Sequence, residues 1–342
     1  MFETTTLTSR LTRRPRRLRT SETIRDLVRE TTLAPQKLVL PLFIIEGQKR
    51  NEPIEAMPGR ARLSIELAVD ECRRAVDLGV RAFALFGVID ASLKTPEADE
   101  ALNPDNLLCR ATRAIKEAIG ESCVITDVAL DPYSSLGHDG LIDERGVVMN
   151  DETVEVLAQM AVIHAEAGAD IVAPSDMMDG RVGAIRTALD EADHTQTLIL
   201  SYTAKYASAF YGPFRQALDS APVDAPNVPK DKRTYQMDPA NAREAVVEAL
   251  LDVDEGADML MVKPALPYLD IIARLRATTN LPIAAYHVSG EYAMVKAAAQ
   301  NGWLDERACM MEMLTSIARA GADFILTYAA MDYARWWRET FT

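Results

Sequence analysis

The sequence predicts an α/β protein, a (β/α)8 TIM barrel preceded by an extended N-terminal arm, and two observations lead to this fold. Eight short apolar runs recur along the chain, and helical patterns fall between them. Near-continuous apolar runs are typical of parallel strands that are covered on both faces. The runs cover residues 38–45, 81–89, 122–130, 169–175, 198–205, 257–265, 281–289 and 322–330. Such a barrel typically needs about 250 residues plus insertions, which this chain can supply.

The helical segments carry apolar stripes. One is expected over residues 151–167, with Val154, Leu157, Ala161 and Ala165 on one face. Another is expected to begin at Asp238 and Pro239, because Asp is a common N-cap and proline is tolerated at the first helical position. The stripe of this second helix consists of Val246, Ala249, Leu250 and Val253.

Glycines mark the junctions between helices and the strands that follow. Glycine there can adopt the left-handed conformation that ends a helix. The pattern occurs at Gly79, Gly168, Gly256 and Gly321. A doubly wound open sheet is the alternative fold, but the glycine-rich dinucleotide-binding turn after the first strand is absent. We therefore expect a barrel and no organic cofactor.

Composition and charge exclude several classes of protein. The chain has 342 residues and a net charge of −14, which argues against a nucleic-acid binder. No apolar stretch reaches the roughly 18–20 residues of a membrane span, and we expect no membrane association. The four cysteines are far apart and indicate neither a disulfide framework nor a zinc ribbon. A cytoplasmic location is the simplest expectation.

The N-terminal arm, expected over residues 1–35, differs in charge from the barrel domain expected over residues 36–342. Residues 10–19 read RLTRRPRRLR. Three interpretations are open: a solvated flexible tail, a transit peptide, and a segment that docks on an acidic neighbouring subunit. The residues by themselves do not choose between them.

Two lysines close two of the expected strands. Lys263 stands in MVKPA, and Lys205 ends LILSYTAK. A lysine is rarely buried unless it is paired or functional, and the C-terminal ends of barrel strands carry the chemistry. Two neighbouring ammonium groups repel each other, so one amine can be neutral near pH 7 and attack a carbonyl to form a Schiff base. A lysine that only reaches the rim of the barrel is the alternative.

Two further segments after strands are candidates for function. Residues 206–237 form a long irregular segment with cationic side chains, and this segment is either a lid that binds a carboxylate or an ordinary solvated loop. Residues 127–140 contain Asp127, Asp131, His138 and Asp139. Such oxygen-rich sets suit hard cations such as Mg²⁺, and a simple turn is the alternative.

Five motifs lie at the expected strand ends. They are APSDMMDGR (173–181), SYTAKYASAFYGPFR (201–215), YQMDPAN (235–241), GADMLMVKPA (256–265) and YHVSGEY (286–292). Together they closely resemble the porphobilinogen synthase (delta-aminolevulinic acid dehydratase) family, and the resemblance extends from about residue 30 to residue 335. It implies the asymmetric condensation of two 5-aminolevulinate molecules into porphobilinogen, with loss of two waters, in tetrapyrrole biosynthesis.

The resemblance also implies roles for the two lysines. Lys263 matches the lysine that forms a Schiff base with the A-side substrate, and Lys205 matches the lysine that binds the P-side substrate. Asp127 or Lys205 is expected to assist proton removal in the ring-forming step.

Carboxylate-binding residues are implied in the same way. Arg215 and Lys232 fall at lid positions that grip the A-side carboxylate. Lys232 replaces an arginine that is common in the family, so Arg233 beside it is the alternative, since lysine lacks the planar fork of arginine. The other expected substrate-binding residues are Gln236 and the P-side pair Ser289 and Tyr328.

The metal content implied by the resemblance is that of the aspartate-rich branch without zinc. Ala129, Asp131 and Asp139 stand where the zinc-dependent branch has three cysteines, and without thiolates a tetrahedral zinc site is not expected. Asp131 and Asp139 could instead hold an active-site cation, and Glu248 matches the ligand of an allosteric Mg²⁺, with a plain surface glutamate as the alternative. Activity without metal is also possible in this branch.

The resemblance favours docking as the role of the arm. Members of the family are homo-oligomers, usually octamers and sometimes hexamers, in which the arm wraps a neighbouring subunit. Two rival functions stay open: a class I aldolase with one Schiff-base lysine, and a non-catalytic assembly or nucleic-acid-binding protein that acts through the basic arm.

Overall fold

The computed structural model describes residues 12–341, and its contacts divide the chain into two units, residues 1–32 and 33–342. In the first unit, the short helix η2 (Pro15–Arg19) precedes α1 (Glu22–Leu27), and neither helix has a buried side chain. The Ser21 hydroxyl caps α1 by accepting a hydrogen bond from the Ile24 amide at 3.3 Å. Residues 1–11, which include the first two positions of the basic segment, lie outside the described residues.

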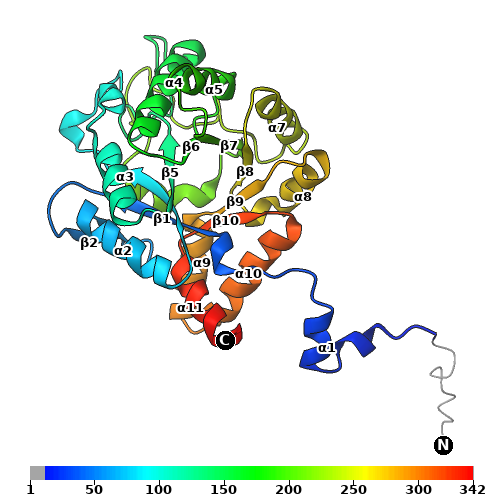
Figure 1. Ribbon diagram of the computed structural model, residues 1–342. Helices are drawn as coiled ribbons and strands as arrows, with labels where there is room; N and C mark the ends of the chain where they lie inside the picture. The colour runs from blue at the N-terminus through cyan, green and yellow to red at the C-terminus, as the bar shows by residue number, and fades with distance from the viewer. Residues whose placement is uncertain (1–11, 342) are drawn as a thin grey trace, which may run out of the picture. The chain divides into compact units, whose positions relative to one another are not determined.

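In the second unit, eight parallel strands within the described residues form a closed barrel (Figure 1). Each strand pairs with the next along the chain, and the last pairs with the first through Leu38 and Ile325. The strands are β1 (Leu38–Ile44), β4 (Ala82–Gly87), β5 (Cys123–Val128), β6 (Ile171–Pro174), β7 (Leu198–Lys205), β8 (Met259–Lys263), β9 (Ile283–His287) and β10 (Phe324–Thr327). Every predicted run contains one of these strands, so the predicted barrel is confirmed.

Helices surround the barrel in Figure 1. Those of the second unit are α2 (Ile65–Asp77), α3 (Leu107–Ala118), α4 (Asn150–Glu166), α5 (Arg181–Glu191), α6 (Gly212–Leu218), α7 (Glu244–Asp254), α8 (Leu269–Thr278), α9 (Ser289–Gln300), α10 (Glu306–Ala320) and α11 (Ala330–Phe341). The predicted junction glycines adopt positive φ angles, as at Gly168 (97°) and Gly256 (99°), so they end helices as expected.

The helix expected at Asp238 begins later, at Glu244, and the N-cap prediction is wrong. The Asp238 carboxylate instead accepts a hydrogen bond from the Ala240 amide at 2.8 Å, which closes a local turn. Leu250, predicted on the buried stripe of α7, is 45% exposed, whereas Ala249 is buried.

Side chains alternate between the inside and the outside of the barrel along each strand. Inward side chains form one apolar cluster, which includes Val39, Ala84, Ile125, Ala173, Leu200, Met261, Ala284 and Leu326. Outward side chains pack against the helices in a second cluster. The interior is therefore a packed core below the mouth, as in other barrels of this kind.

A hairpin of two short strands lies beside the C-terminal end of β1. β2 (Asn51–Pro53) pairs antiparallel with β3 (Ala61–Leu63), and β3 pairs with β1 through Phe43 and Arg62. The hairpin thus places its side chains next to the mouth of the barrel.

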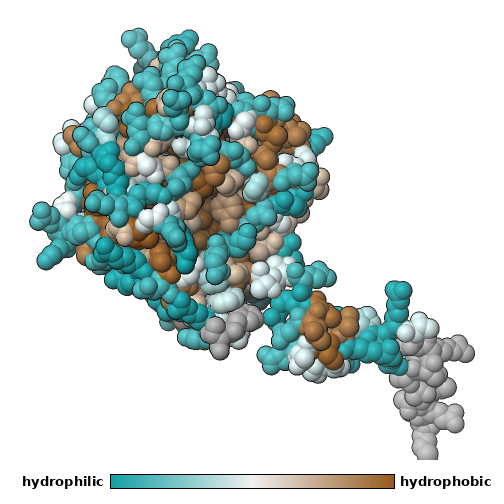
Figure 2. Space-filling model, in the orientation of Figure 1, coloured by the Kyte–Doolittle hydropathy of each residue, from teal (hydrophilic) through white to brown (hydrophobic). Residues whose placement is uncertain are grey.

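Hydrophilic residues cover most of the visible face of the barrel in Figure 2, and hydrophobic residues gather toward a recess near its middle. In residues 12–341, no helix combines the length and the apolar character that a membrane crossing requires.

Candidate active site

Lys205 and Lys263 are direct neighbours at the mouth of the barrel. They are register partners at the ends of β7 and β8, and their exposed fractions are 6% and 5%. Lys263 faces inward by plain alternation, since Met261 also faces inward. Lys205 faces inward because the pairing register shifts between Ser201 and Ala204, an irregularity that re-aims the side chains after it.

Aromatic rings enclose the amine of Lys263. Its Nζ lies 4.6 Å from the ring centre of Tyr286, 4.9 Å from that of Phe214 and 5.1 Å from that of Tyr202. Burial, followed by repulsion from the Lys205 ammonium group, lowers the pKa of Lys263 to about 7. At neutral pH a large fraction of this amine is therefore uncharged and nucleophilic.

Lys205 has polar surroundings instead. Its Nζ donates a hydrogen bond to the Ser175 carbonyl oxygen and lies 3.6 Å from Oδ2 of Asp139. Asp139 also accepts from Lys232 Nζ at 3.1 Å, and Lys232 Nζ reaches Asp131 Oδ2 at 3.1 Å. Two ammonium groups and two carboxylates thus alternate in one buried cluster, the Asp131–Lys232–Asp139–Lys205 cluster.

The opposite charges within this cluster stabilise one another in their ionised forms. Burial by itself raises the pKa of Asp139, but the ammonium groups of Lys205 and Lys232 overcome this effect and lower it. The carboxylates of Asp131 and Asp139 likewise outweigh the burial of Lys232 and raise its pKa. Lys232 therefore stays charged and cannot be a nucleophile near neutral pH.

Asp127 faces the two lysines from β5. Burial, and next the charge of Asp131, raises the pKa of Asp127 to about 6, although Lys205 and Lys263 oppose the shift. One of its carboxylate oxygens is buried without a hydrogen-bond partner in the described part of the chain. A carboxylate with this pKa and a free oxygen can accept a proton from a bound molecule.

The residues expected for the P-side carboxylate lie beside Lys263. Ser289 Oγ accepts a hydrogen bond from the amide of Phe214 at 3.0 Å, and the Tyr328 hydroxyl lies 2.9 Å from that of Tyr286. Phe214 and Tyr286 are also the rings that enclose Lys263. Ser289 follows β9, which adjoins β8, and Tyr328 follows β10, which adjoins β9, whereas β7 adjoins neither of these two strands.

Residues 206–237, the segment expected to form a lid, bring four expected residues to different places. Lys232 is buried in the cluster, whereas Arg233 is exposed, with its side chain 3.7 Å from Asp231. The Gln236 side-chain amide donates to Asp139 at 3.5 Å, and its Oε1 is buried without a partner among residues 12–341. Arg215 is half-buried on α6, and no carboxylate of the described residues pairs with it. Of the two alternatives, Lys232 lies in the site and Arg233 does not.

The two aspartates proposed as cation ligands are engaged by Lys232 rather than arranged around an open position. No group of three or more potential metal ligands of the His, Cys, Asp and Glu type occurs in the described residues. The donor set of this cluster therefore does not fit an active-site cation. Glu248 lies apart from it, on α7.

Glu248 is half-buried and lines a cavity of about 430 Å³ with Asp179, Glu244 and Tyr235. Burial raises its pKa, and it accepts no hydrogen bond from the described residues. Tyr235 connects this cavity to the cluster, because its hydroxyl accepts a hydrogen bond from the Asp139 amide at 3.2 Å.

Sequence reasoning missed two parts of the site. The first is the set of rings around Lys263, although alternation from Leu200 could have placed Tyr202 on the inner face of the barrel. The second is a buried network in which Arg181 binds Asp252 and Ser201, each at 3.1 Å. Nothing in the sequence spacing connects these residues, which come from different elements.

The fold and the two buried lysines define a barrel enzyme that acts on a carbonyl compound through a Schiff base. Comparison with known proteins identifies the family. Residues 12–336 match the delta-aminolevulinic acid dehydratase family, and the chain belongs to it. The predicted family and its hydro-lyase class are thus confirmed.

The similarity to individual relatives extends over nearly the whole chain. A chloroplastic delta-aminolevulinic acid dehydratase of Selaginella martensii is 58% identical over 96% of this chain and 77% of its own length. A delta-aminolevulinic acid dehydratase of Bradyrhizobium diazoefficiens is 55% identical over 93% of this chain and 88% of its own. The Toxoplasma gondii enzyme, solved with the reaction product porphobilinogen, is 52% identical, with a TM-score of 0.93 over 96% of this chain and 92% of that one.

Proposed function

We propose that this protein condenses two molecules of 5-aminolevulinate into one porphobilinogen and two waters, with Lys263 and Lys205 as its Schiff-base lysines. The observation that carries this proposal is the pair of buried lysines in register at one mouth, one of which has a pKa of about 7. A class I aldolase needs only one such lysine. The second, polar lysine site thus favours a reaction that joins two carbonyl substrates.

The side chains around Lys263 and around Lys205 differ, and they define two substrate sites. Lys263, with Ser289 and Tyr328 nearby, takes the substrate whose carboxylate those hydroxyls bind, and this is the P-side role. Lys205, with Lys232 and Gln236, takes the A-side role. We thus exchange the two labels that the motifs alone suggested, and the rings of Phe214 and Tyr286, which contact both Lys263 and the P-side pair, support this exchange.

The chemistry follows from these positions. The neutral Lys263 amine and the Lys205 amine each attack the ketone of one substrate, and each imine forms with release of one water. The carbon next to the Lys205 imine forms the C–C bond to the imine carbon on Lys263, and the amino group of the Lys263-bound substrate forms the C–N bond and displaces Lys205. Loss of protons from carbon then eliminates the Lys263 amine, so both lysines are regenerated. One C–N bond and one C–C bond join the two substrates, so the two ketone oxygens leave as the two waters. Asp127 is placed to accept the proton that leaves carbon, because its pKa of about 6 lies near neutrality. The lid excludes water from the imines meanwhile.

Incubation of the purified protein with 5-aminolevulinate alone tests this function. We expect one porphobilinogen for every two substrate molecules consumed. Cleavage of hydroxy-ketones without porphobilinogen would favour the aldolase instead. Salt-dependent nucleic-acid binding without any turnover would favour the non-catalytic alternative.

For metals, we propose that an allosteric Mg²⁺ binds at Glu248 and that neither zinc nor an active-site cation takes part. A half-buried carboxylate without a hydrogen-bond partner supports this role. Because Mg²⁺ usually keeps several waters, one or two carboxylates from the protein suffice. The ion would act through Tyr235 on the position of the lid.

A chelator titration tests the metal proposal. We expect EDTA to lower activity several-fold, Mg²⁺ to restore it, and Zn²⁺ to have no such effect. Oligomer size should be followed by light scattering in the same samples, with Glu248→Gln as the matched variant that no longer responds to Mg²⁺. Stoichiometric zinc in the purified protein would contradict the proposal, and unchanged activity in EDTA would indicate an enzyme that works without metal.

We also propose a cytoplasmic homo-oligomer, an octamer or a hexamer, with the N-terminal arm docked on a neighbouring subunit. Exposed apolar side chains on α7, namely Val247, Leu250 and Leu251, support a further subunit contact. Widely spaced free cysteines support the location.

A further inference from the structure

The lid helix α6 is short and depends on contacts with the barrel. It has seven residues, and an isolated helix of this length is not stable in water. Yet it carries Phe214, whose ring covers Lys263, and Arg215. Whatever holds α6 in place therefore also completes the site.

The start of α6 rests on α9. The Phe214 amide donates to Ser289 Oγ, and the Phe210 backbone lies against Gly290, where an added Cβ would meet the Phe210 carbonyl oxygen at 2.5 Å. The Tyr211 hydroxyl donates to the Lys263 carbonyl oxygen at 3.1 Å. These contacts hold the N-terminal half of the lid helix against the barrel.

The end of α6 is held by two cations from elsewhere in the fold. Arg62 on β3 donates to the carbonyl oxygens of Ala217 at 2.7 Å and Gln216 at 2.6 Å. Lys94 donates to the carbonyl oxygen of Asp219 at 2.6 Å. The last carbonyls of a helix lack partners within the helix and carry partial negative charge, so both cations satisfy and stabilise this end.

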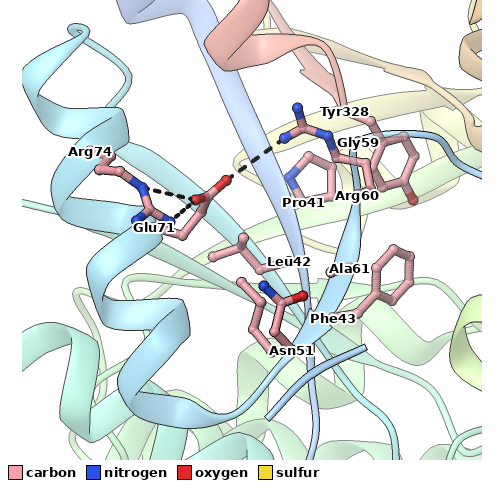
Figure 3. A pocket seen from close by; sticks show the side chains of 11 residues that line it. Pro41, Leu42, Phe43, Asn51, Gly59, Arg60, Ala61, Glu71, Arg74 and Tyr328 are labelled. Atoms are coloured by element: carbon pink, nitrogen blue, oxygen red, sulfur yellow. Dashed lines mark hydrogen bonds and ion pairs between the residues drawn. The ribbon is translucent and has the colours of Figure 1, made fainter. Parts of the chain in front are cut away.

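The hairpin that carries Arg62 is itself fixed to the barrel. Arg60, two residues earlier, lies 3.3 Å from Asp332 on α11 and 3.8 Å from Glu71 on α2. Figure 3 shows the contact of Arg60 with Glu71, which also binds Arg74, beside a cavity of about 130 Å³ that Tyr328 lines. Arg62 therefore reaches the lid from a rigid support.

We infer that Arg62 is a positioning residue for the reaction: it latches the C-terminal end of α6 and so keeps Phe214 and Arg215 over the substrate site, with Lys94 as a second contact. This role rests on the proposed function, because it assigns α6 to the lid of that site. It is not a catalytic role, since Arg62 touches the lid backbone and not the reacting groups.

Kinetics of Arg62→Met test the latch. Loss of two charge-assisted hydrogen bonds should lower kcat/KM for 5-aminolevulinate about 10-fold, mostly through a higher KM, because the closed lid is less populated. Arg62→Lys keeps one donor and should recover part of the loss. Arg50→Met removes a cation just before β2 whose side chain contacts Glu46 and Glu52 instead of α6, and it should behave like the wild type.

The pH dependence of imine formation gives a second measurement. Because Phe214 contributes to the burial of Lys263, an open lid should move the midpoint of borohydride trapping above pH 7 in Arg62→Met. The charged and titratable groups that face Lys263 are the same in both proteins, namely Lys205, Asp127, Asp131, Asp139, Tyr202, Tyr211 and Tyr286.

Limited trypsin digestion tests the latch without substrate. Cleavage after Arg215, inside α6, should be slow in the wild type and about 10-fold faster in Arg62→Met and Lys94→Met. Cleavage after the exposed Lys230 and Arg233 is the internal control and should not change. Equal cleavage after Arg215 and unchanged kinetics in all variants would overturn the inference. A wild type that makes no porphobilinogen would refute the proposed function, while the digestion would still decide the latch.

Discussion

Replacing Lys263 with methionine should abolish porphobilinogen formation, with kcat lower by on the order of 10⁴-fold or more, because no other amine in the ring-lined pocket can form the imine. Methionine fills a similar volume among the rings of Tyr202, Phe214 and Tyr286, so the fold should survive. Steady-state assay of porphobilinogen, together with thermal unfolding, measures both effects.

The lowered pKa of Lys263 also determines whether Lys263→Met stabilises or destabilises the fold. The pKa of Lys263 is lowered in the folded protein, to about 7 from an unfolded value of 10.5, so the folded state binds fewer protons than the unfolded chain between these values. Such a group destabilises the fold at pH 7, and its removal should leave the Tm unchanged or raise it. Lys37→Met, at an exposed lysine, is the matched control for both activity and Tm. Activity near the wild-type level in Lys263→Met would contradict the assignment.

Replacing Lys205 with methionine should separate the two substrate sites. Imine formation at Lys263 should persist, whereas porphobilinogen formation should fall by on the order of 10³-fold, because the second substrate loses its amine partner. Trapping with borohydride followed by intact-mass measurement distinguishes these outcomes.

The pH dependence of the same variant provides an independent test. The Lys205 ammonium group is one of the causes that lower the pKa of Lys263, so its loss raises that pKa. Since only the neutral amine attacks, the midpoint of trapping against pH should move upward from about 7. A variant that forms porphobilinogen at the wild-type rate, with an unmoved midpoint, would show that Lys205 has no role in the reaction.

The barrel and the direction of Lys263 could be predicted from the sequence because both depend on local patterns. Apolar runs locate the strands, and alternation from Met261 turns Lys263 inward. The direction of Lys205 could not be predicted in this way. Simple alternation from Leu200 and Tyr202 points Ala204 inward, and only the register shift in β7 brings Lys205 to the mouth.

The other features that the sequence did not predict depend on contacts between residues that are far apart along the chain. Asp131 and Asp139 have the composition of a cation site, but Lys232, 93 residues beyond Asp139, occupies the position between them. The grouping of Ser289 and Tyr328 with Lys263 likewise follows from strand order in the closed barrel, which a motif does not contain. The N-cap at Asp238 failed because its carboxylate satisfies a turn before the helix begins.

Whether Lys263 carries the substrate imine can be measured directly by reduction of the protein with borohydride in the presence of isotope-labelled 5-aminolevulinate, followed by peptide mapping. We expect a labelled, reduced adduct on Lys263 in the wild type and in Lys205→Met, and none at that peptide in Lys263→Met. Label found only on other residues, with Lys263 unmodified while porphobilinogen is being formed, would contradict it.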